Sequence, residues 1–72
     1  MATQTTPNHP YRRFIKLAQV RSYTSLSTSE IYRRISNGTF PVQVSLGPNS
    51  VAWVESEVLQ WCDDLAAQRE VS

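Results

Sequence analysis

The sequence predicts a small α+β domain with three short helices and a two-stranded β-hairpin. Three observations predict it. Apolar residues recur at helical spacing before residue 37 and again after residue 54. Between these regions they alternate with polar residues, and the turn-forming run Gly47-Pro48-Asn49-Ser50 divides that stretch into two arms. With 72 residues, the chain is long enough for one domain, whose core is near the smallest that folds alone.

Residues 1–11 are expected to form a flexible tail, because Thr, Pro and Asn dominate them and apolar residues are almost absent. His9 lies in this tail and is expected to be solvated. The folded domain is expected to cover residues 12–68, with 69–72 frayed at the end. The basic run Tyr11-Arg12-Arg13 at the border fits either an arm along phosphates or a frayed terminus.

The first helix is predicted after the short extended pair Phe14-Ile15. Leu17 and Val20 have the i, i+3 spacing of a helix of about two turns, which ends at Tyr23 or Thr24. The connection to the next helix is only about three residues long. Two short helices joined in this way form a helix-turn-helix, in which the second helix is the one that can enter a groove.

The second helix is predicted from Thr28 to Ser36. Ser27 is a good N-cap, and Glu30 stands where its carboxylate could reach back to the Ser27 N–H in a capping box. Asn37-Gly38 supplies residues that tolerate left-handed backbone angles at the end, and Pro41 cannot continue a helix.

The two faces of this helix differ in character. Ile31 and Ile35 share the face that we expect to be buried. Thr28 and Arg34 lie on the borders of this apolar face, whereas Ser29, Arg33 and Ser36 point the opposite way and Tyr32 lies between. We expect no carboxylate on this outward side. Such side chains can approach a DNA groove and donate to base edges or phosphates. The same pattern also fits an ordinary amphipathic helix with a solvated face.

The alternating stretch predicts a wing. Val42, Val44 and Leu46 define one strand, the four residues Gly47–Ser50 the loop, and residues 51–54 the second strand. A hairpin after a helix-turn-helix commonly lies beside phosphates or in the minor groove. Its tip is polar and uncharged here, so we expect the wing to contribute less to binding than the second helix.

The third helix is predicted to open at Glu55-Ser56-Glu57, where the helix dipole favours acidic residues. An apolar stripe at i, i+3, i+4 and i+7 then predicts about three turns with one buried face: Val58, Trp61, Cys62 and Leu65. We assign Trp53 and Trp61 to the core. Cys62 is interpreted as a small buried hydrophobe, because no His follows it that could activate a nucleophile.

Net charge is only +1, but its distribution is uneven. Up to residue 54 there are six basic residues and one acidic residue, whereas five of the six acidic residues of the chain come later. This distribution favours the binding of phosphate on one side of the fold. The alternative is that the asymmetry arises by chance in a short chain.

Several classes of protein are excluded by features that the sequence lacks. No apolar run approaches the roughly 18 residues of a membrane span, and no secretory signal is present, so we expect a cytoplasmic protein. One cysteine cannot form an internal disulfide, and no Cys/His spacing indicates a metal. Without a nucleophile–base pair or a phosphate loop, we expect neither a cofactor nor enzymatic activity.

Four segments together resemble the AlpA-like family of small phage and prophage regulators, which is similar in fold to excisionases and MerR-type DNA-binding domains. The segments are L-S-x-S-x-I-Y-R-x-I at 26–35, G-x-F-P at 38–41, V-x-L-G at 44–47 and V-A-W-V-E-S-E-V-x-x-W at 51–61. The resemblance covers residues 14–67.

The resemblance implies a winged helix-turn-helix that binds short double-stranded DNA sites, with the second helix in the major groove and the wing at the minor groove. It implies a recombination directionality factor for excision, a transcriptional regulator, or both. A tyrosine-type integrase and cooperative copies of the chain on DNA are the implied protein partners. The expected DNA-binding residues combine this pattern with the outer face of the helix: Ser27, Thr28, Ser29, Tyr32, Arg33, Arg34, Asn49 and Ser50.

The chain is less basic than the family pattern. Many members carry a basic residue where this chain has Thr28, Ser36, Thr39, Ser45 and Asn49. We therefore expect fewer phosphate contacts and a shallower salt dependence of binding. Arg34, where many members are apolar, either extends to a phosphate with its stem over the core edge or is solvated.

The alternative function is a protein interaction module. In that case the third helix would pair with a second copy or with a recombinase, and association through an apolar face would depend little on salt.

Overall fold

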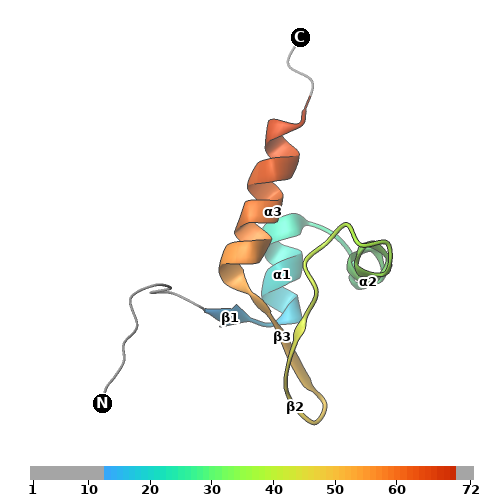
Figure 1. Cartoon of the computed structure of the whole chain (residues 1–72), viewed down its shortest axis with the longest axis vertical. Helices are drawn as coiled ribbons and strands as arrows, with labels where there is room; N and C mark the ends of the chain where they lie inside the picture. The colour runs from blue at the N-terminus through green and yellow to red at the C-terminus, as the bar shows by residue number, and fades with distance from the viewer. Residues whose placement is uncertain (1–12, 70–72) are drawn as a thin grey trace, which may run out of the picture.

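The computed structural model describes residues 13–69 and contains three helices and an antiparallel three-stranded sheet, which confirms the α+β class. The elements in chain order are β1 (Phe14–Ile15), α1 (Leu17–Thr24), α2 (Thr28–Ser36), β2 (Val44–Gly47), β3 (Ser50–Val54) and α3 (Glu55–Ala67). In Figure 1, α1 and α3 lie side by side, α2 stands apart from them, and the β2–β3 hairpin projects at the opposite end from the tip of α3. The predicted N-terminal tail, with His9, lies outside the described residues.

The sheet has one strand more than the predicted hairpin. Phe14 pairs with Val54 and Ile15 with Trp53, which gives the strand order β1-β3-β2. The Glu55 N–H donates to the Arg13 carbonyl at 2.7 Å, just beyond this ladder. A two-residue strand is too short to show alternation, so only its partner in the fold reveals it. β1 thereby ties the start of the domain to the strand that leads into α3.

The hairpin turn is tighter than predicted. β2 begins at Val44 rather than Val42, and Gly47 pairs directly with Ser50, so only Pro48 and Asn49 form the connection. Gly47 has φ of 156° and Asn49 has φ of 59°, and the register shifts between Ser45 and Gly47. This bulge allows the short turn, because Gly adopts the required backbone angle without a Cβ clash.

The core takes one buried residue from each of β1, α1, α2, β3 and α3, and one from the segment that follows α2. Its buried members are Ile15, Val20, Ile31, Phe40, Trp53 and Val58. Trp53 is fully buried, as predicted, and Leu26 packs against this cluster just before α2.

The apolar stripe of α3 is buried only in part. Val58 is buried and Trp61 and Cys62 are half-buried, but Leu65 is 46% exposed, so its predicted place in the core is wrong. The reason is visible in Figure 1, where the C-terminal half of α3 extends past α1 and the rest of the body. Helical spacing identifies the face of a helix but not how far its neighbours reach along it.

Two indole groups hold the segment that links α2 to the hairpin. Trp53 Nε1 donates to the Pro41 carbonyl at 3.2 Å, and Trp61 Nε1 donates to the Thr39 carbonyl at 2.8 Å. Phe40, between these carbonyls, is buried with its ring edge-on to Trp61 at 4.8 Å between centroids. The link is therefore anchored to β3 and α3, which fixes α2 relative to the hairpin.

Candidate nucleic-acid interface

The N-terminus of α2 is capped and polar. Ser27 has the extended backbone of an N-cap, and its Oγ accepts from the Glu30 N–H at 3.2 Å. The first N–H groups of a helix, here those of Thr28 and Ser29, have no acceptor within the helix and form the positive end of its dipole. Ser27 and Ser29 are exposed and Thr28 is half-buried. This end of α2 can therefore approach an anion closely.

The C-terminus of α2 is equally well defined. Gly38 has φ of 77°, its N–H donates to the Ile35 carbonyl, and the Thr39 N–H donates to the Arg34 carbonyl at 2.8 Å. This pair of bonds is the Schellman motif, which ends a helix at a left-handed residue. Asn37 itself keeps a right-handed helical conformation. α2 thus has the bounds predicted from its cap residues.

Glu30 departs from two expectations. Its carboxylate does not complete a capping box with the Ser27 N–H, because Arg33 and Arg34 occupy it. Arg33 Nε donates to Oε1 at 3.1 Å, Arg33 Nη2 donates to Oε2, and Arg34 Nε donates to Oε2 at 2.8 Å. The prediction that the arginine side of α2 carries no carboxylate is therefore wrong. The i, i+3 and i, i+4 spacings that favour a capping box also favour ion pairs.

This cluster alters the charge of Glu30. Hydrogen bonding from Arg33, with the positive charges of Arg33 and Arg34, lowers the pKa of the Glu30 carboxyl below its ordinary 4.5, although partial desolvation opposes the shift. Glu30 is therefore ionised at neutral pH and offsets one of the two arginine charges on α2.

Arg33, Arg34 and Tyr32 differ in exposure. The Arg33 side chain is 61% exposed and that of Arg34 31%, with the Arg34 Cζ 5.8 Å from the centre of the Trp61 ring. The Arg34 guanidinium thus lies beside the Trp61 ring, with its Nε bonded to Glu30. Tyr32 is 38% exposed and its ring packs edge-on to Trp53 at 6.1 Å. Tyr32 therefore joins the outer face of α2 to the base of the hairpin.

The hairpin brings an additional basic residue near the predicted wing contacts. Asn49 is exposed at the tip, but the Ser50 hydroxyl accepts from Lys16 Nζ at 3.3 Å. Lys16 Nζ also donates to the Val51 carbonyl at 3.1 Å. The position of Lys16 beside the hairpin could not be predicted from the sequence, because Lys16 lies 34 residues from Ser50 and only the folded sheet brings the two residues together.

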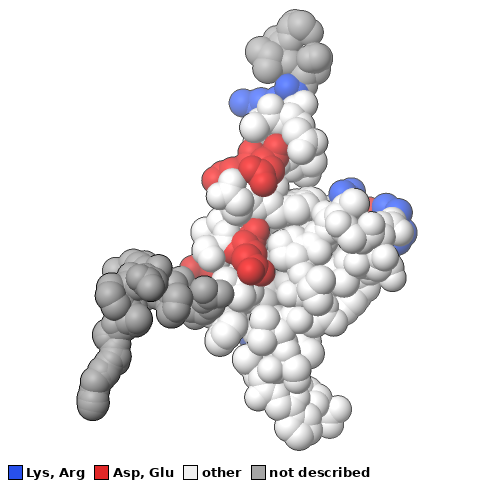
Figure 2. All heavy atoms as spheres, viewed as in Figure 1, with Lys and Arg blue, Asp and Glu red and all other residues white. Residues whose placement is uncertain are grey.

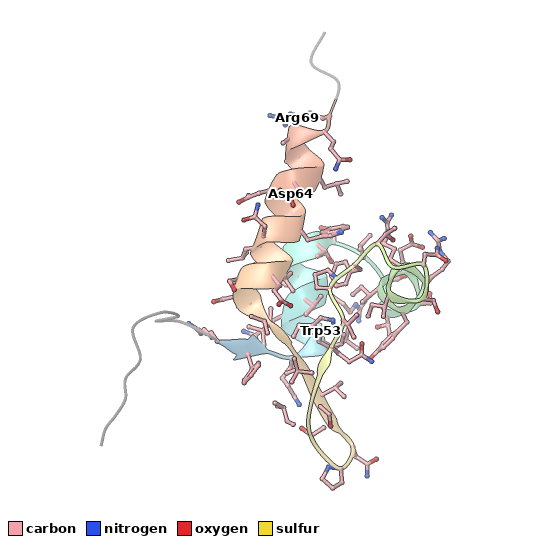
Figure 3. The ribbon with its side chains drawn as sticks, viewed as in Figure 1. Trp53, Asp64 and Arg69 are labelled. Carbon is pink, nitrogen blue, oxygen red and sulfur yellow. The ribbon has the colours of Figure 1, made fainter. Side chains whose placement is uncertain are left out.

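Most acidic side chains lie on α3, whereas α2 carries two arginines together with Glu30. Figure 2 shows acidic side chains gathered along α3, and basic side chains on α2 at the side of the molecule. The acidic residues of α3 are Glu55, Glu57, Asp63 and Asp64. In Figure 3 side chains on the outer side of α2 project away from the body, and Trp53 lies at the base of the hairpin, whereas Ile31 on the inner side of α2 is buried. The uneven charge of the sequence therefore becomes only a partial separation in space, because Glu30 lies beside the arginines of α2 and Arg13 Nε lies 4.0 Å from Glu55 Oε1.

Other chemically relevant groups lie away from α2. The Cys62 thiol has a raised pKa, because of desolvation and then the Asp63 carboxylate, so it is protonated at neutral pH. The Tyr23 hydroxyl donates to Glu55 Oε2 at 2.8 Å. Within residues 13–69, no cluster of three or more His, Cys, Asp or Glu is placed to hold a metal. No helix in this range is long and apolar enough to span a membrane.

The fold and this face define a small winged helix-turn-helix: α1 and α2 form the helix pair, β2 and β3 the wing, and α3 the support. The family profile described as "Prophage CP4-57 regulatory protein (AlpA)" matches residues 13–66. The chain is also 42% identical over 64 residues to "Uncharacterized protein ORF88" of Enterobacteria phage P4, covering 89% of this chain and 73% of that protein. The chain belongs to the AlpA family of prophage regulatory proteins.

Proposed function

We propose that this prophage regulatory protein binds specific double-stranded DNA sites, with α2 in the major groove and the hairpin at the adjacent minor groove. The observation that carries the proposal is the presentation of α2. It is capped at both ends, anchored through two indole N–H groups, and exposes Ser27, Ser29 and Arg33 to solvent. A short polar helix held rigidly in this way suits a groove better than an interior.

The proposed contacts follow from exposure and chemistry. Arg33 reads a base or contacts a phosphate, and the Tyr32 hydroxyl contacts a phosphate. Ser27, Thr28 and Ser29 approach the backbone at the positive end of α2. Arg34 contributes a phosphate contact from its place beside Trp61. Asn49 and Ser50 reach the minor groove, with Lys16 beside Ser50.

In the cell, we propose that this binding directs excision of a prophage or integrative element, regulates transcription, or does both. The family membership supports a regulatory role of this kind. For excision, the protein would bind near an attachment site and assist a tyrosine-type integrase by bending DNA. A reconstituted excision reaction with the cognate integrase tests this role, because a regulator of transcription alone would not change its yield.

Arg33→Ala tests the DNA-binding proposal. If Arg33 reads a guanine, the variant should bind a selected site roughly 10- to 100-fold more weakly and lose preference at one base pair. Gel-shift titration at fixed salt measures both. Arg69→Ala is the matched control, because it removes the same charge at the far end of α3 (Figure 3). Equal binding by Arg33→Ala and the wild-type chain would remove Arg33 from this role.

The hairpin is expected to be secondary to α2. Its exposed tip residue, Asn49, is uncharged, so Asn49→Ala should weaken binding less than Arg33→Ala does. The same titration compares the two variants. A larger loss from the hairpin change would reverse this ranking.

A second candidate function is self-association through α3. Leu59 and Leu65 are 40% and 46% exposed on this helix, whose C-terminal half extends past the body (Figure 1). Sedimentation without DNA measures such pairing, and Leu65→Gln should abolish it. Apolar association should persist at high salt, whereas DNA binding should weaken steeply.

A further inference from the structure

Glu30 engages Arg33 along one particular edge of its guanidinium group. Arg33 Nε and Nη2 both donate to the carboxylate, one to each oxygen. Neither bond involves Nη1, and among residues 13–69 no acceptor is bonded to that nitrogen. The Nη1–Nη2 edge of an exposed side chain is therefore available, and its orientation is restrained by the pairing on the adjacent edge.

That available edge has the geometry used to read guanine. An arginine recognises guanine by donating two parallel hydrogen bonds to O6 and N7 in the major groove. A long unrestrained arginine must lose rotamer freedom to do so, and it can equally contact any phosphate. An arginine already held by a carboxylate on its own helix loses less freedom when it binds the base.

The same carboxylate reduces attraction to DNA of any sequence. Glu30 Oε2 also accepts from Arg34 Nε, so a single negative charge lies between the two positive charges of α2. Sequence-independent affinity comes mainly from neutralising phosphates with positive charge. A carboxylate at this position therefore weakens binding to generic duplex while leaving the base-reading edge of Arg33 in place.

We infer that Glu30 is a specificity-determining positioning residue: it orients Arg33 for guanine and suppresses binding to other sequences. The inference rests on the proposed function, since it concerns how the same face of α2 discriminates between sites. This role also accounts for the presence of an acidic residue on a helix that would approach the polyanionic DNA. A role limited to stabilising the helix through i, i+3 and i, i+4 pairs would predict no effect on base preference.

The test is in vitro selection from a random duplex pool, performed with the full chain and with Glu30→Gln. Gln has nearly the helix propensity of Glu and leaves the Ser27 cap on the backbone N–H intact. The wild-type chain should select a motif containing a strongly preferred guanine. Glu30→Gln should reduce that preference roughly tenfold and should bind a fixed random-sequence duplex more tightly, with a salt slope steeper by about 1.

Glu57→Gln is the matched control, because it removes the same charge from an exposed position on α3. In an Arg33→Ala background, Glu30→Gln should no longer change base preference, since Glu30 acts through Arg33. Unchanged guanine preference in Glu30→Gln would overturn the inference, as would equal effects of Glu30→Gln and Glu57→Gln. If the wild-type chain selects no motif and binds no duplex, the proposed function fails and the inference falls with it.

A second measurement does not require DNA. In the ¹⁵N spectrum of the wild-type chain, the Arg33 Nε–H resonance should be observable and slow to exchange near neutral pH, because that hydrogen is bonded to Glu30. It should shift and exchange faster in Glu30→Gln. An Arg33 Nε–H that exchanges as fast as that of Arg69 in the wild-type chain would overturn the restraint on which the inference depends.

Discussion

Gly38 determines where the candidate recognition helix ends. Its φ of 77° is strained for any residue with a Cβ, although a Cβ there would meet no atom within 4 Å. Gly38→Ala should therefore lower the free energy of unfolding by about 1 kcal/mol through backbone strain alone. Urea denaturation measures this change. Asn37→Ala is the matched control, since Asn37 is helical with φ of −83°, and a loss as large as that of Gly38→Ala would refute strain as the cause.

Glu30 should make stability depend on pH in the acid range. Its folded-state pKa lies below the ordinary value of 4.5, so its stabilising contribution is complete above that value and disappears as pH falls through the folded-state pKa. The difference in unfolding free energy between wild type and Glu30→Gln should therefore be constant from pH 7 to about pH 5.5 and shrink below about pH 4.5. Thermal or urea unfolding across this range measures it. A difference that grows on acidification would contradict the pairing.

Among the elements, β1 illustrates how two residues can anchor a domain. Ile15 is 1% exposed and pairs with Trp53, whereas Phe14 is 45% exposed on the other face of the strand. Ile15→Ala should cost about 2 to 5 kcal/mol in unfolding free energy, and Phe14→Ala clearly less, although phenylalanine loses the larger side chain. Urea denaturation of both variants tests this. Equal losses would indicate that β1 is not oriented as described.

The hairpin offers a gain-of-function test at the level of an element. The tip residue Asn49 occupies a left-handed conformation and is exposed. The double variant Pro48→Lys, Asn49→Gly would keep a residue that tolerates the left-handed conformation at position 49 and would add one positive charge at position 48. This variant should bind generic duplex more tightly, with a salt slope steeper by about 1. An unchanged salt slope would indicate that the hairpin does not lie beside the DNA.

Across the whole molecule, the sequence predicted best those features that depend on neighbours along the chain. The bounds of α2 followed from Ser27 and Gly38, and the position of the hairpin from its turn residues. The third strand, the Lys16–Ser50 bond and the two indole anchors join residues far apart in sequence. They could not be predicted because no local pattern marks them. Leu65 was misplaced for a similar reason, since burial depends on where neighbouring elements stop.

The candidate site was predicted by residue type but not by interaction. The outer face of α2 carries the expected hydroxyls, Tyr32 and Arg33, yet the sequence did not reveal that Glu30 pairs with both arginines. Spacing alone allows Glu30 either a capping box or ion pairs, and the folded chain adopts the latter. The charge that α2 presents is therefore smaller than a count of its arginines indicates.

The most direct test of the central claim is a titration of the ¹⁵N-labelled chain with its selected duplex, followed through backbone amide shifts. If α2 and the hairpin form the interface, the largest changes should map to residues 27–34 and 49–50, with smaller changes along α3. Arg33→Ala should reduce the changes on α2 at equal duplex concentration. Shifts concentrated on α3, with those on α2 unaffected, would contradict the account.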